Sequence, residues 1–222
     1  MILNISNLSK TYGSNIIYDK FDIEFETEKV NCILGKSGCG KSTLLNLIVG
    51  VLKPDNEDFK PIEKNKISYI FQEDRLIEWI TLEENMKLIG KRYYDKNSLD
   101  NVINKYLNLV GIEEYRKKYP QKLSGGIRQR GNIARALIKP SKYIIMDEPF
   151  KSIDVKIKYE TMKKIKHIIK EESKTAIFVT HDIDEALFLA DKIFVLGEKP
   201  VVVKGEFNNS EKINREDIIK LI

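Results

Sequence analysis

The chain has 222 residues, of which 42% are hydrophobic and 32% charged, a balance typical of a globular protein rather than a disordered one. Its net charge of +5 suits a polyanionic ligand or a membrane surface but is too modest to indicate nucleic acid. No stretch approaches the roughly 20 apolar residues that cross a bilayer, and no secretory signal is visible. We therefore expect a cytoplasmic-type chain whose two cysteines, Cys32 and Cys39, are reduced.

The first half of the chain begins with patterns typical of strands. Two strands are predicted at 2–12 and 16–26, separated by a Gly-Ser-Asn turn signal. The apolar run 30–34 predicts a third strand, and an apolar helix pattern begins at Ser42. Residues from about 81 to 119 are rich in charge and mostly helical in pattern, which predicts a helical lobe inserted into an α/β core.

The second half adds two apolar runs, 143–146 and 176–180, that predict strands buried on both faces. The first of these runs is followed by Asp147 and Glu148, and the second by His181. In open α/β sheets, chemistry gathers beyond the carboxyl ends of parallel strands, so these strand ends and that of 30–34 predict one site. The tail carries a short strand pattern at 201–203 and a final helix from about residue 215.

The segment after the third strand has the strongest functional pattern. Residues 35–42 fit G-x-x-x-x-G-K-[ST] at every fixed position, between a predicted strand and a predicted helix. Backbone N–H groups of such a loop turn inward on phosphates, and the helix N-terminus adds partial positive charge. Lys41 can reach the β- and γ-phosphates, and Ser42 can hold Mg²⁺. We expect a nucleotide to be bound by Gly35, Lys36, Ser37, Gly38, Cys39, Gly40, Lys41, Ser42 and Thr43.

Two further segments have patterns that suggest chemistry. A strand-end Asp assists Mg²⁺ in P-loop NTPases, which assigns that role to Asp147 and leaves Glu148 to orient or deprotonate a water. Residues 123–129, Leu-Ser-Gly-Gly-Ile-Arg-Gln, open a helix that Pro140 ends. Ser124 and its two glycines at the N-terminus of this helix form a second candidate anion site, although taken alone they would be an ordinary helix cap.

In this order, the phosphate loop, Leu-Ser-Gly-Gly, the Asp-Glu strand end and the late histidine resemble the ATP-binding cassette of ABC transporters over roughly residues 3–196. The resemblance implies an α/β P-loop NTPase fold with a RecA-like core, a trimmed antiparallel β lobe and a helical lobe at about 76–135. It implies that residues 1–222 form a single ATP-binding domain. ATP and Mg²⁺ are the implied cofactors, and ATP hydrolysis is the implied activity.

The resemblance also implies roles for individual residues. Tyr12 would stack on adenine, Gln72 would join Mg²⁺ and water to the helical lobe, and His181 would contact the γ-phosphate. Asp154 would lie on a loop that crosses a dimer seam. A partner copy's ATP would be contacted by Ser124, Gly125, Gly126 and Gln129, so that two copies bury two ATPs head to tail. The implied catalytic set is Glu148, His181, Gln72 and Lys41, and the implied Mg²⁺ ligands are Ser42, Gln72 and Asp147.

The segment 71–85 is similar to cassettes of the nitrate, sulfonate, taurine and bicarbonate importer group, where it meets the permease. Trp79 is the only tryptophan; it is either an exposed anchor for a partner or a core residue of the helical lobe. This likeness implies membrane permease subunits, an external solute-binding protein, a location at the cytoplasmic face of the membrane, and no nucleic-acid partner. The alternatives are a cassette for export or lipoprotein release, or a soluble ABC ATPase acting on ribosomes or DNA.

Three features depart from the family's pattern. Thr27-Glu28-Lys29 stands where a glycine usually precedes the strand before the phosphate loop. The segment 50–71 is shorter than usual and lacks a Gly-flanked strand pair, so the antiparallel lobe is expected to be trimmed. Gly131 occupies a helical position at a cost of up to about 1 kcal/mol relative to alanine.

Overall fold

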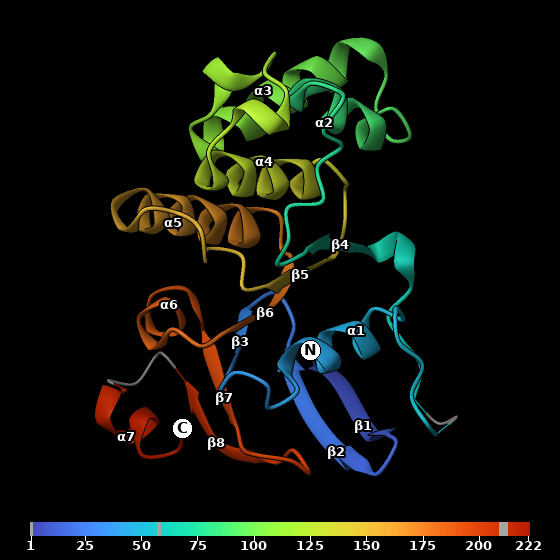
Figure 1. Cartoon of the computed structure of the whole chain (residues 1–222), viewed down its shortest axis with the longest axis vertical. Helices are drawn as coiled ribbons and strands as arrows, with labels where there is room; N and C mark the ends of the chain where they lie inside the picture. Colours follow the sequence, from blue (N-terminus) through green and yellow to red (C-terminus); the bar gives the residue numbers. More distant parts are fainter. Residues whose placement is uncertain (1, 57–58, 209–212) are drawn as a thin grey trace.

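A computed structural model describes residues 2–56, 59–208 and 213–222 (Figure 1). Its centre is a sheet made of β3 (Val30–Leu34), β4 (Ile67–Ile70), β5 (Tyr143–Asp147), β6 (Thr175–Thr180), β7 (Lys192–Leu196) and β8 (Val203–Asn208). The strand order is β4-β5-β6-β3-β7-β8, and only the last pairing is antiparallel. The three strands predicted to end at the site are therefore neighbours, and their carboxyl ends share one edge.

Apolar side chains of β3 alternate between two hydrophobic cores, one on each face of the sheet. Ile33 packs into the core shared with α1 (Lys41–Ile48), whereas Cys32 and Leu34 pack into the core shared with α5 (Val155–Glu171) and α6 (Ile183–Leu189). This burial on both faces explains the continuous apolar runs. A last helix, α7 (Arg215–Ile219), follows β8.

The helical lobe consists of α2 (Leu82–Gly90), α3 (Lys96–Val110) and α4 (Gly125–Leu137), which lie at one end of the long axis of the molecule (Figure 1). Gly131 lies inside α4, where an added Cβ would stand 2.6 Å from Cδ1 of the buried Leu82. The glycine lets α4 approach the start of α2, which gives this departure a packing reason. Among the described residues, none of the helices combines the length and apolarity needed to span a bilayer.

The antiparallel lobe is trimmed, as expected. It contains β1 (Ile2–Tyr12) and β2 (Asn15–Glu26), and the described residues between α1 and β4 add no strand. The strand predicted at 201–203 is wrong, because β8 begins only at its last residue. Val201 instead donates its N–H to the Ile17 carbonyl of β2 (2.8 Å), and Pro200 has no N–H to offer a ladder. Both cysteines are free and buried.

Glu28 adopts a left-handed conformation, with φ at +62°, at the position where the sequence departs from glycine. A residue with a Cβ costs roughly 1–2 kcal/mol there. We expect Glu28→Gly to raise the free energy of unfolding by about 1 kcal/mol, partly offset by the backbone freedom that glycine loses. The bond from the Glu28 N–H to Thr175 Oγ1 survives because the backbone makes it. Urea unfolding measures the change. The control is Glu24→Gly on the exposed face of β2, which should lower the free energy of unfolding. An equal decrease in both variants would contradict the role of the Glu28 conformation.

Candidate functional site

The phosphate loop, Gln72 and Glu148 meet around one cavity of about 300 Å³. The cavity is lined by Ser37, Gly38, Gly40, Lys41, Ser42, Thr43, Gln72, Glu148, Lys151 and Lys199. Because β5, β6 and β3 are adjacent and parallel, three segments far apart in the sequence reach this edge of the sheet. The structure thus brings together the residues that the three strand ends predicted.

Lys41 lies at the start of α1 with its side chain folded onto the loop that precedes it. Its Nζ donates to the carbonyl oxygens of Gly35 (2.7 Å) and Lys36 (2.9 Å), and the residue is 5% exposed. In the part of the chain that the structure describes, no carboxylate forms an ion pair with this ammonium. A buried positive charge without a counter-ion suits a phosphate-bearing ligand.

Ser42, which lines the cavity, is hydrogen-bonded to Asp147 at the end of β5. The Ser42 hydroxyl donates to Asp147 Oδ1 at 3.0 Å. Burial raises the pKa of Asp147 above its usual range, against the hydrogen bond from Ser42. These oxygens are ligands that Mg²⁺ prefers, and Mg²⁺ is usually held by one or two protein ligands together with substrate phosphates. Residues 2–56, 59–208 and 213–222 hold no cluster of three His, Cys, Asp or Glu that could hold a metal ion.

Glu148 and His181 form a pair at the ends of β5 and β6. His181 Nδ1 lies 3.0 Å from Glu148 Oε1. Burial favours the neutral acid, but the hydrogen bond and the charges of His181 and Lys151 outweigh it and lower the pKa of Glu148 below its usual range. Glu148 is therefore ionised at neutral pH, the form that can accept a proton.

The other carboxylate oxygen of Glu148, Oε2, is buried and has no hydrogen bond within the described ranges. The ammonium of Lys151 lies 3.5 Å from it. Glu148 also has a φ of +41°, a strained conformation, and its N–H donates to the Val179 carbonyl. Strain of this kind clusters at functional sites, and Oε2 forms an ion pair with Lys151, which also lines the cavity.

None of Ser124, Gly125 and Gly126 lines the phosphate cavity; Gly125 lines a second cavity, which shares Gln72 with it. Ser124 caps α4 by accepting from the Ile127 N–H, and an added Cβ on Gly126 would stand 3.0 Å from the Ser152 carbonyl oxygen. The segments 124–126 and 152–154 are therefore in contact. Asp154 is exposed and caps α5 by accepting from the Lys156 N–H.

The family model described as ABC transporter matches residues 18–151. The chain belongs to this family. An aliphatic sulfonates import ATP-binding protein of Pseudomonas savastanoi is 32% identical over 90% of this chain and 82% of that protein. A nitrate import ATP-binding protein of Synechococcus elongatus is 34% identical over 92% and 79%. The solved dimer of the ATP-binding cassette MJ0796 with ADP and Pi has a TM-score of 0.82 at 29% identity, covering 94% of this chain and 99% of that chain. The predicted cassette fold is confirmed.

One residue of this ABC cassette differs from its predicted placement. Gln129, expected to face a partner's ATP, is 4% exposed and donates through Nε2 to the Pro149 carbonyl at 2.9 Å. It is buried on α4, five residues after Ser124, and so ties this helix to the loop after β5. In this structure its amide is used inside the chain.

Tyr12 lies at the end of β1, opposite Asn15, and is 46% exposed. It does not line the phosphate cavity. The same hairpin is fixed to the phosphate loop, because the Tyr18 hydroxyl donates to the Gly40 carbonyl at 3.0 Å. An exposed ring on a hairpin anchored to the loop is available to a nucleotide base.

Two lysines of the cavity were missed by the sequence analysis. Lys151 follows Glu148 by one turn, and its nearness to the acid was a usable signal. Lys199 comes from the connection between β7 and β8, and only the tertiary fold brings it to the phosphate loop. Together with Lys41 they make the cavity strongly positive.

Proposed function

We propose that this chain is the ATP-hydrolysing subunit of an ABC importer for a small anion of the nitrate or sulfonate kind. The observation that carries the proposal is the single cavity at which the phosphate loop meets Glu148, itself held by His181. The names of the relatives from Pseudomonas savastanoi and Synechococcus elongatus support import and the solute class. In this proposal residues 1–222 form one ATP-binding domain, with 76–135 as its helical lobe.

Each residue at the cavity has a separate role in ATP hydrolysis. Lys41 exchanges the loop carbonyls for the β- and γ-phosphates, and the loop N–H groups cradle the same oxygens. Ser42, Gln72 and Asp147 would hold Mg²⁺, which when bound neutralises phosphate charge. Glu148 orients a water through its carboxylate and takes one proton from it, while the water oxygen bonds to the γ-phosphorus and the bond to ADP breaks. His181 keeps the carboxylate in place, and Tyr12 stacks on adenine.

The second anion site is completed by a partner copy. Ser124, Gly125 and Gly126 do not reach the cavity of their own chain, and they contact the loop that carries Asp154. In a head-to-tail dimer these segments would close over the γ-phosphate held by the partner. The MJ0796 cassette, solved as a dimer, supports this arrangement.

Ser124→Arg should leave ATP binding by the monomer unchanged and abolish ATP-driven dimerisation, because a long cation replaces a small cap at the seam. Loss of the cap alone costs about 1 kcal/mol of stability. Size-exclusion chromatography with ATP, in a Glu148→Gln background, measures the dimer. Asn214→Arg, which removes the N-cap of α7 and adds the same charge, is the control. Normal dimerisation of the Ser124 variant would rule out the shared site.

The segment after Gln72 is suited to meet a permease. Trp79 is 79% exposed, so of the two alternatives it is a surface residue. The segment is tied to α4: Arg128 pairs with Asp74 (2.8 Å), and Asn132 donates to the Phe71 carbonyl (3.1 Å). A partner that binds Trp79 can therefore change the positions of Gln72 and α4 together. We propose that this partner is the permease, with an external solute-binding protein in the complex, at the cytoplasmic face of the membrane.

Purification of the tagged chain from gently solubilised native membranes tests the function, and a permease should co-purify. Trp79→Ala should reduce the recovered permease at least about tenfold, as expected for an aromatic anchor. Phe188→Ala, which removes an aromatic side chain 40% exposed on α6, is the matched control. Recovery of ribosomes or DNA-repair proteins in place of a permease would contradict the transporter assignment.

A further inference from the structure

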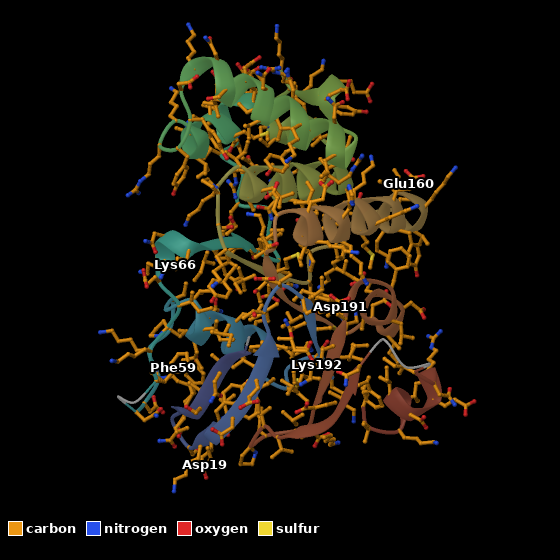
Figure 2. All side chains as sticks on the ribbon, turned by 180° about the vertical axis from the view of Figure 1, so that it is seen from behind. Asp19, Phe59, Lys66, Glu160, Asp191 and Lys192 are labelled. Atoms are coloured by element: carbon orange, nitrogen blue, oxygen red, sulfur yellow. The ribbon has the colours of Figure 1, made fainter. Side chains whose placement is uncertain are left out.

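The end of α2 and the loop that leads to α3 form a basic surface on the helical lobe. We define the 87–96 surface as residues Lys87 to Lys96. Lys91, Arg92 and Lys96 are exposed, and within the described ranges none of them forms an ion pair. The pKa of Lys139 is lowered, chiefly by burial and in addition by the positive charge of Arg92. Figure 2 shows side chains with nitrogen tips projecting from this end of the molecule.

Two carboxylates beside this surface are neutralised, whereas Asp95, inside it, caps α3 by accepting from the Asn97 and Ser98 N–H groups and forms no ion pair within the described ranges, so that Lys91, Arg92 and Lys96 oppose one acid. Glu83 pairs with both Lys87 and Arg116, and Asp100 also pairs with Arg116. The unpaired cations therefore leave a local excess of positive charge. A field of this sign attracts an anionic partner.

Apolar side chains are interleaved with the cations. Leu88 is 55% exposed, Ile89 38% and Tyr93 37%. Leu88 and Lys91 lie three residues apart, on the same side of the helix end. Alternation of cations with leucine, isoleucine and tyrosine is the composition of segments that lie at a membrane interface.

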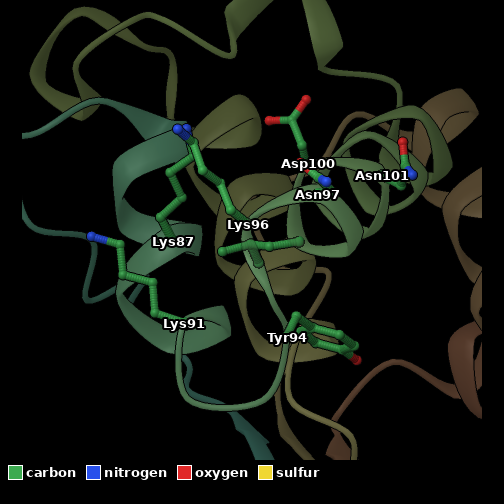
Figure 3. A pocket seen from close by; sticks show the side chains of 8 residues that line it. Lys87, Lys91, Tyr94, Lys96, Asn97, Asp100 and Asn101 are labelled. Atoms are coloured by element: carbon green, nitrogen blue, oxygen red, sulfur yellow. The ribbon is translucent and has the colours of Figure 1, made fainter.

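A cavity of about 890 Å³ opens beside these residues. Lys87 and Lys91 line it from the end of α2, and Lys96, Asn97, Asp100 and Asn101 line it from α3; Figure 3 shows the Lys91 side chain pointing away from those of Lys87 and Lys96. The ammonium and amide groups of this lining can donate to the phosphate of a headgroup, and Asp100, the acid among the lining residues, is paired with Arg116.

We propose that the 87–96 surface binds the anionic headgroup layer of a bilayer. The cations hold lipid phosphates while Leu88, Ile89 and Tyr93 enter the boundary with the acyl chains. The proposal rests on the proposed function only for the nearness of a membrane. The contact itself needs no permease, so it adds a second attachment, and one signal of this size gives reversible binding.

Sedimentation with vesicles tests the proposal. The full chain should bind vesicles of phosphatidylcholine mixed with phosphatidylglycerol, should bind phosphatidylcholine alone weakly, and should be released by salt. K91Q/R92Q/K96Q should lower the partition coefficient by about 100-fold, because each basic residue near an anionic surface contributes about fivefold. Leu88→Ser should weaken binding as well, with no change in ATP affinity for either variant.

The control is K163Q/K164Q/K170Q, which removes the same charge from exposed positions on α5. Because the whole chain carries +5, equal losses in the two triple variants would reduce the effect to general attraction and overturn the proposal. Absence of wild-type binding would overturn it too, while leaving permease co-purification untouched. Release by inorganic phosphate beyond that by chloride of equal ionic strength would make the ligand a free phosphate and also overturn it.

Discussion

A Glu148→Gln variant should bind ATP and dimerise but hydrolyse ATP at least about 100-fold more slowly than the wild type. The amide keeps the size of the side chain and can still bond His181, yet it accepts no proton from water. Because ATP is no longer consumed, the dimer should accumulate.

Phosphate release measures the rate, and size-exclusion chromatography with ATP measures the dimer. Glu160→Gln, which makes the same change at an exposed position of α5, should alter neither. Wild-type turnover by the Glu148 variant would show that another group takes the proton. Loss of ATP binding would mean that the pair with His181 supports the cavity rather than the chemistry.

Lys41→Ala should weaken ATP affinity by at least about 100-fold. Hydrogen bonds to charged groups contribute about 1.5–3 kcal/mol each, and Lys41 makes two in this structure that phosphate oxygens would take over. Calorimetric titration of the full chain with ATP gives the change, and circular dichroism checks the fold. Lys163→Ala, on the exposed side of α5, is the charge-matched control. Tight binding by the Lys41 variant would end the phosphate-loop assignment.

The parts of the site that the sequence predicted are those fixed by local pattern. The glycine and lysine spacing of 35–42 fixes a loop between a strand and a helix, and apolar runs buried on both faces place Asp147 and His181 at neighbouring strand ends. Parallel pairing then brings these ends to one edge without further information.

The parts that were missed depend on packing between distant segments. Gln129 looks like any polar residue of an amphipathic helix, and only the loop after β5 decides that its amide is buried. Lys199 reaches the cavity through a connection whose strand pattern was assigned too early, because Val201 bonds to β2 rather than to the central sheet. No local periodicity encodes either contact.

Gln72 and Trp79 share one short segment, with the first in the phosphate cavity and the second 79% exposed. Where a partner on Trp79 and ATP in the cavity each bind one position of this segment more tightly, the partner changes ATP affinity by some factor. Thermodynamic linkage then requires ATP to change the partner's affinity by the same factor. The coupling can therefore be measured either as the effect of the partner on ATP affinity or as the effect of ATP on the partner's affinity. A substitution that removes one of these effects must also remove the other.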